Sequence, residues 1–151
     1  MFGGIIAALL TGAAAAGAVS ADVGHSHNVR IDHHRGPVDA EYRSSVTITH
    51  RQIGAVTPGR AGSTLRCLWR ADMTVERDAR HAAGTMTRTM TRDGALTGSR
   101  PGWCDGAKAA IARDVAIRGT VLRDHLVAMA EQDRAVLTAE VDRLHDTAHG
   151  A

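Results

Sequence analysis

Alternating apolar and polar positions dominate the middle of the chain. Over residues 41–56, Tyr42 and Ile48 fall on one side of an extended chain, and mostly arginine and threonine fall on the other. Over 63–77 the alternation is clearer, with apolar side chains at every second position: Leu65, Cys67, Trp69, Ala71, Met73 and Val75. A period of two residues is that of a strand with one buried face. Both segments are therefore predicted to be β-strands that cover a core.

Weaker strand candidates flank these two segments. Residues 28–34 alternate over a short stretch that ends at a glycine–proline turn signal. Residues 82–96 place Met86 and Met90 on one face and threonines on the other. Asp93-Gly94 predicts a turn, or the tip of a hairpin, because this dipeptide favours tight turns. The sequence thus predicts about four strands in chain order.

After residue 104 the hydrophobic period changes. Apolar residues now recur at spacings of three, four and seven: Ile111, Val115, Leu122, Leu126, Met129, Leu137, Val141 and Leu144. This spacing is typical of an amphipathic helix. Gly119 predicts a break, because glycine inside a helix costs about 1 kcal/mol. Helices are expected over 105–118 and 120–147, or as one kinked helix. Strands followed by helices predict an α+β fold, an antiparallel β-meander with the C-terminal helix or helix pair packed on the sheet.

The first 21 residues contain no charged side chain. An apolar centre is followed by small residues, and Val19-Ser20-Ala21 suits cleavage by signal peptidase. We therefore expect a signal peptide at 1–21, a flexible mature N-terminus at 22–27 and one domain at 28–148. The protein would be periplasmic or extracellular, with no membrane contact after cleavage. A retained membrane anchor is the alternative, because the segment is about long enough to span a bilayer.

Cys67 and Cys104 are the only cysteines. Two cysteines in an exported chain most simply form a disulfide. Cys67 faces the predicted core and Cys104 precedes the first predicted helix, so the bond would fasten the helix to the sheet. A redox couple or a pair of metal ligands is the alternative, although two thiols alone make a poor zinc site.

Charge and motif content exclude several classes of function. The chain has 18 basic and 16 acidic residues, a net charge of +2, and its basic residues are scattered. Nucleic-acid binding needs a concentrated basic face, so no nucleic-acid partner is expected. No nucleophile elbow or phosphate-binding glycine motif occurs. No catalytic residue is therefore predicted, and a small hydrolase with an unrecognised site stays an alternative.

Nine histidines are the most unusual feature of the composition. Neutral imidazole is a common ligand for copper, zinc and nickel. His25 and His27 would share one face of a strand, and His145 and His149 would lie one helical turn apart. These four residues are the candidate metal ligands, and no other cofactor is indicated. The adjacent pair His33-His34 would point to opposite faces of a strand, so it is not expected to hold one ion.

The leading hypothesis for function is a small, non-catalytic, exported domain. It would act as an interaction or structural module of the cell envelope, with a protein or another envelope component as partner. Outward-facing Arg43, Arg51, Arg66 and Arg70 would suit an acidic partner. A histidine-based transition-metal-binding module is the main alternative. The sequence indicates no oligomeric state.

Overall fold

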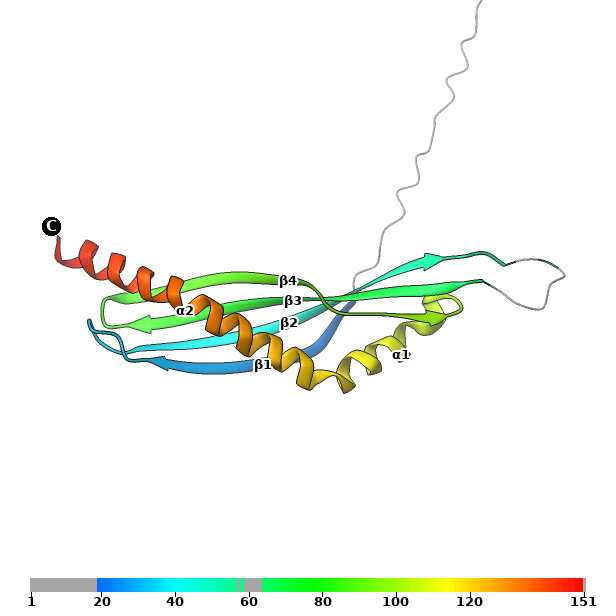
Figure 1. Cartoon of the computed structure of the whole chain (residues 1–151), viewed down its shortest axis with the longest axis horizontal. Helices are drawn as coiled ribbons and strands as arrows, with labels where there is room; N and C mark the ends of the chain where they lie inside the picture. Colours follow the sequence, from blue (N-terminus) through cyan, green and yellow to red (C-terminus); the bar gives the residue numbers. More distant parts are fainter. Residues whose placement is uncertain (1–18, 57, 59–63, 151) are drawn as a thin grey trace, which may run out of the picture.

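The structure, a computed structural model, describes residues 19–56, 58 and 64–150, with side chains from residue 24 onward. Strands and helices follow one another in this part of the chain: β1 (Val19–Ile31), β2 (Val38–Ile53), β3 (Arg66–His81), β4 (Gly84–Pro101), α1 (Cys104–Ile117) and α2 (Gly119–His149). The strands form one antiparallel sheet in the order β1-β2-β3-β4. Both helices lie across the same face of this long sheet (Figure 1). The α+β meander predicted from the sequence is confirmed.

The core lies between the helices and the inner face of the sheet. Strands β2 and β3 bury every second side chain, as their period predicted: Val38, Ala40, Tyr42, Val46, Ile48, Cys67, Trp69, Ala71, Met73, Val75 and Ala79. The helices bury the matching apolar stripe: Ile111, Val115, Leu122, Leu126, Leu137 and Val141. Each such side chain stabilises the fold by about 1.5–3 kcal/mol when fully buried. The helices therefore cover the apolar face of the sheet and remove it from water.

Strand β1 is longer than the sequence pattern indicated. It is paired with β2 from Val19 to Ile31, with an irregularity between Ala21 and His25. The prediction of a flexible segment at 22–27 is therefore wrong. The polar side chains of this segment gave no strong period of two, and backbone pairing to β2 makes it a strand. The predicted signal peptide falls mostly on residues 1–18, which lie outside the described residues.

Strand β4 also differs from the prediction. Asp93-Gly94 is no hairpin tip but part of a bulge, because β4 pairs with β3 on both sides of it. Gly94 has a φ of 61° and its N–H donates a 2.7 Å bond to Asp72 Oδ1. The same dipeptide suits either feature, since both need a residue at positive φ. The turn between β3 and β4 lies instead at Ala82-Ala83.

The predicted break between the helices is confirmed. Helix α1 ends at Ile117 and α2 begins at Gly119, one residue later. Asp114 on α1 faces β4 and accepts two hydrogen bonds from Arg100, of 2.9 and 3.0 Å. Within the described ranges, neither helix has the length and apolarity needed to cross a membrane.

Candidate functional site

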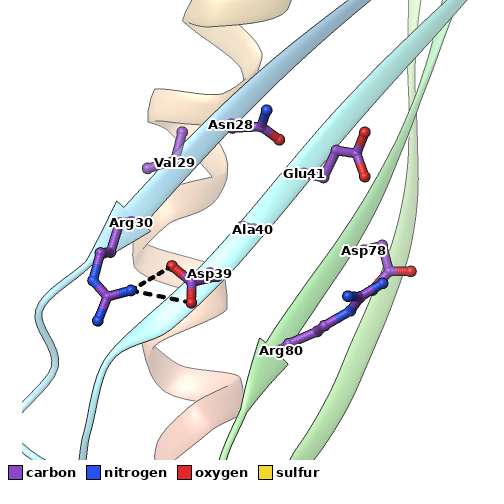
Figure 2. Close-up of a pocket in the computed structure, with 8 residues that line it drawn as sticks. All are labelled: Asn28, Val29, Arg30, Asp39, Ala40, Glu41, Asp78 and Arg80. Atoms are coloured by element: carbon purple, nitrogen blue, oxygen red, sulfur yellow. Dashed lines mark hydrogen bonds and ion pairs between the residues drawn. The ribbon is translucent and has the colours of Figure 1, made fainter.

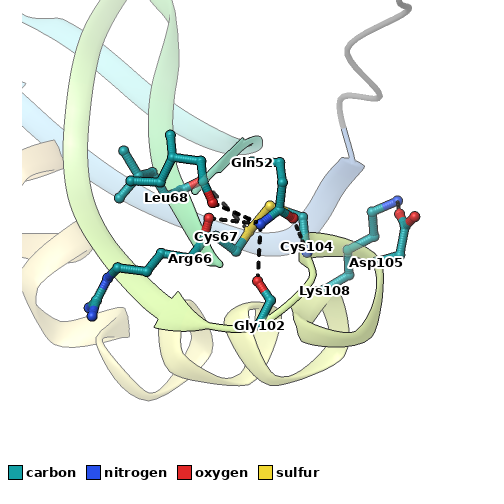
Figure 3. Close-up of a disulfide and its surroundings, with 9 residues drawn as sticks. Gln52, Arg66, Cys67, Leu68, Gly102, Cys104, Asp105 and Lys108 are labelled. Carbon is teal, nitrogen blue, oxygen red and sulfur yellow. Dashed lines mark hydrogen bonds and ion pairs between the residues drawn. A yellow bond between two sulfur atoms is a disulfide. The ribbon is translucent and has the colours of Figure 1, made fainter. Parts of the chain in front are cut away.

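The predicted disulfide is confirmed. Cys67 and Cys104 are bonded, with their Cα atoms 4.8 Å apart, inside the usual range for such bonds. Cys67 is fully buried at the start of β3, and Cys104 is the first residue of α1. The bond fastens the helix to the sheet at the end of the molecule shown in Figure 3.

Gln52 on β2 reinforces this junction. Its Nε2 donates to the carbonyl oxygens of Arg66 at 3.0 Å and Gly102 at 3.1 Å. Its Oε1 accepts a 2.7 Å bond from the N–H of Cys104. Helix α1 has no side-chain cap on its own N-cap residue, so Gln52 satisfies one of the free N–H groups that every helix start leaves. Strand, turn and helix start are thereby held in one arrangement (Figure 3).

The outer face of the sheet at this end carries a group of residues that we call the basic patch: Arg51, Arg66, Leu68 and Arg70. Arg51 lies opposite Leu68 in the register of β2 and β3. Arg70 binds Asp72 at 2.9 Å. Arg66 donates to a serine hydroxyl and, like Arg51, meets no carboxylate among the described residues. Leu68 is partly exposed within a shallow hollow on this face. The patch therefore combines unpaired positive charge with an apolar centre.

The other end of the same face is neutralised by its own ion pairs. Arg30 binds Asp39 at 3.0 Å, and Arg80 lies 3.8 Å from Asp78. A shallow hollow between these pairs is lined by mixed charge (Figure 2). Arg43 binds Glu41 nearby, and this bond holds the pKa of Glu41 below its usual value. Of the outward arginines that the sequence singled out, Arg43 is therefore paired within its own sheet.

A charged network is buried between α2 and the sheet. Asp133 on α2 accepts hydrogen bonds from Tyr42 at 3.1 Å, Arg77 at 2.7 Å and Arg88 at 2.6 Å. Arg77 also donates to Glu140. The side chains of Arg77 and Asp133 are 0% exposed. This network was not predicted from the sequence, although Arg77 continues the inward period of β3 and Asp133 interrupts the apolar stripe of α2.

The electrostatics of this network fix its protonation. Burial raises the pKa of Tyr42, and Asp133 raises it further, so the phenol stays neutral. Burial by itself would lower the pKa of Arg77, but its bonds to Asp133 and Glu140 outweigh this and raise it. Buried charges are tolerated only when they are paired in this way. The network thus fixes the position of α2 on the sheet.

The predicted metal ligands fall into two separate pairs. His25 and His27 lie on β1 and share the face that the helices cover; a Cβ on Gly119 would lie 3.5 Å from His25 Nε2. His145 and His149 stack near the end of α2, with ring centroids 4.0 Å apart. Gly119 and His145 are separated by about 39 Å of helix, at 1.5 Å per residue. The four histidines therefore form no common site.

His33 and His34 do come together, contrary to the prediction. Strand β1 ends at Ile31, so the rule of alternating faces does not apply to the turn that follows. Their ring centroids lie 4.2 Å apart. Both Nε2 atoms lie 3.5 Å from Oδ1 of Asp142 on α2. This cluster is the one group of three or more possible metal ligands within the described residues.

His50 is a further histidine with an unusual environment. Both of its ring nitrogens are buried without a hydrogen-bond partner. Burial lowers its pKa, and the ammonium group of Lys108 on α1 lowers it further, while Asp105 acts in the opposite direction. The pKa of His145 is also lowered, chiefly by the loss of hydration and by His149. His50 is half-buried on the inner face of the sheet, and its lowered pKa favours the neutral ring at pH 7.

Fold and sites together define a small α+β domain with a one-sided sheet and a helix bonded to that sheet by a disulfide. Comparisons with models of known families, with curated proteins and with solved structures gave no match for this chain. The functional inference below therefore depends on the geometry of these residues alone.

Proposed function

We propose that this chain is an exported, non-catalytic interaction module of the cell envelope that binds an acidic protein partner through the basic patch. The observation that carries the proposal is the contrast between the two ends of the open sheet face. At one end arginines are neutralised by neighbouring carboxylates, as with Arg30 and Asp39. At the other, Arg51 and Arg66 lack such partners within the described chain and surround the partly exposed Leu68.

The chemistry of the patch suits a protein surface that carries carboxylates around an apolar side chain. Guanidinium groups bind carboxylates through paired hydrogen bonds, and arginine is favoured where such pairs form at interfaces. Leu68 supplies an apolar contact at the centre, and the disulfide and Gln52 fix the backbone beneath it. A surface that is already ordered loses little entropy on binding. Affinity is expected to fall as salt rises, because the contacts are electrostatic.

Export is supported by the apolar leader and by the disulfide. Disulfides persist in oxidising compartments and are rare in the cytosol. Mass spectrometry of the protein purified from the cell envelope should give the mass of a chain that begins at Asp22, less the two hydrogens lost in forming the disulfide. A full-length mass with free thiols would contradict export.

The partner is tested by site-specific photo-crosslinking in intact cells. A photoreactive amino acid at Leu68 is expected to trap an acidic protein, while the same group at Thr89, on the same face but near the other end, does not. The trapped protein is then purified and its affinity measured. Arg66→Glu should weaken binding at least tenfold, and Arg43→Glu, the matched control, less than twofold. Equal trapping at both positions, or equal loss in both variants, would refute the basic patch as the binding surface.

A further inference from the structure

The strongest additional feature lies at the end of the molecule opposite the disulfide. There the turn after β1 meets the last turns of α2 (Figure 1). We propose that His33, His34 and Asp142 form a binding site for a divalent transition-metal ion, with Zn²⁺ as the test ion. This site differs from the histidine pairs predicted from the sequence. It is independent of the basic patch, because the two lie at opposite ends of the sheet.

The spacing of the three ligand atoms suits a tetrahedral ion. One ligand atom from each of the three residues lies within 4.8 Å of the other two, and both Nε2 atoms are 3.5 Å from Asp142 Oδ1. Zinc binds histidine nitrogen and carboxylate oxygen at about 2.0–2.2 Å, which places tetrahedral ligands about 3.3 Å apart. Both nitrogen–oxygen distances are therefore already close to the tetrahedral value. Imidazole and carboxylate together are a donor set that zinc accepts.

His33 gives independent evidence for a ligand at this place. Its side chain is only 4% exposed, and its Nε2 has no hydrogen-bond partner although it points at Asp142. Oδ1 of Asp142 is also buried without a hydrogen bond, although it forms an ion pair with Arg35 Nε at 3.2 Å. Buried polar atoms almost always have a partner, so such pairs need an explanation. An ion between them would satisfy both atoms.

Arg35 holds the site in the ion-free state. Its Nε–H donates a 3.2 Å bond to His34 Nε2 and lies 3.2 Å from Asp142 Oδ1. The Nη1 atom of Arg35 lies 2.9 Å from Oδ1 of Asp146, with which it forms an ion pair. The guanidinium is therefore a resident cation that a metal ion must displace, and Asp146 can retain it afterwards. The arrangement makes Arg35 a competitor of the metal.

His33 must also change its protonation when the ion binds. Its Nδ1 accepts a 3.2 Å bond from the N–H of Arg35, so the proton of the neutral ring is on Nε2. Metal binding through Nε2 requires the tautomer with the proton on Nδ1, and the bond from Arg35 N–H is then lost. The ion therefore replaces three contacts of Arg35: one from its backbone to His33, and two from its side chain to His34 and Asp142.

Native mass spectrometry and calorimetric titration with Zn²⁺ on the metal-free full chain test the proposal. One ion per chain is expected. His34→Ala and Asp142→Asn should each weaken binding at least tenfold, the range that even supporting residues of metal sites reach. Both side chains are partly exposed, so these variants are expected to fold. Arg35→Gln should strengthen binding, because it removes the competing charge.

His149→Ala is the matched control, since this histidine lies at the same end but outside the cluster. It should leave the affinity unchanged. The absence of a bound ion at equimolar, micromolar Zn²⁺ would overturn the proposal. So would binding that depends on His149 and survives the loss of His34 or Asp142, or weaker binding in Arg35→Gln.

Discussion

The buried charged network makes the sharpest prediction about stability. Replacing Asp133 by leucine removes the acceptor that three donors share and leaves the guanidinium of Arg77 fully buried with Glu140 as its remaining charged partner. Removing one partner of a buried ion pair costs about 3–5 kcal/mol, because the other charge stays buried. Tyr42 also loses its bond, which adds about 1 kcal/mol, whereas Arg88 is 39% exposed and can turn to water. Asp133→Leu should therefore lower the free energy of unfolding by about 4–6 kcal/mol.

A second substitution separates the cost of an unpaired buried charge from the cost of altered packing. Adding Arg77→Met to Asp133→Leu removes both buried charges, so the double variant should recover about 2–3 kcal/mol of the single variant's loss. The matched control is the pair of Arg30 and Asp39, the same residue types but 63% exposed. Asp39→Leu is expected to cost less than about 1 kcal/mol.

The assay is urea unfolding followed by far-UV circular dichroism. It compares the midpoints and the slopes of the single variant, the double variant and the surface control. A loss below about 1 kcal/mol in Asp133→Leu, or a double variant no more stable than Asp133→Leu, would refute the reasoning.

Other parts of the structure give further predictions. Replacing Cys67 and Cys104 by alanine should lower the free energy of unfolding by about 4 kcal/mol, the chain-entropy value for a separation of 37 residues, measured by urea unfolding against the oxidised wild type. Gly98→Ala should cost about 1–3 kcal/mol because the new Cβ would lie 2.5 Å from a buried indole ring, while Gly106→Ala, with nothing within 4 Å, should stabilise α1; similar values for both would contradict this packing. Because the pKa of His50 is lowered, its contribution to the free energy of unfolding is complete above about pH 6.5 and falls below that pH. There the unfolded chain binds a proton at His50 that the folded chain does not. Between pH 5 and pH 8, the melting temperature of His50→Leu should change less with pH than that of the wild type. An equal change in both proteins would count against a lowered pKa of His50.

The local pattern of the sequence determined most of the architecture. The period of two in β2 and β3 identified their buried faces, and the break at Gly119 identified the two helices. These features depend on side chains a few residues apart, so they can be read along the chain. The inward position of Cys67 followed from the same period and correctly placed the disulfide between sheet and helix.

The ends of strands and the choice between related turns were not determined locally. Residues 25–27 belong to a strand because β2 pairs with them, and Asp93-Gly94 forms a bulge because β3 continues opposite it. Both outcomes depend on a neighbouring strand. The local sequence of either segment is compatible with a different structure.

The clusters that carry the functional inferences were decided by tertiary structure alone. His33 and His34 meet Asp142 because the C-terminal part of α2 lies over the turn after β1, more than a hundred residues earlier in the chain. Among the residues that the structure describes, Arg66 meets no carboxylate because of the sheet register, while Arg43 is paired with Glu41 on its own strand. Local periodicity states which face a residue occupies. Only the packing of distant segments decides which charges and ligands meet there.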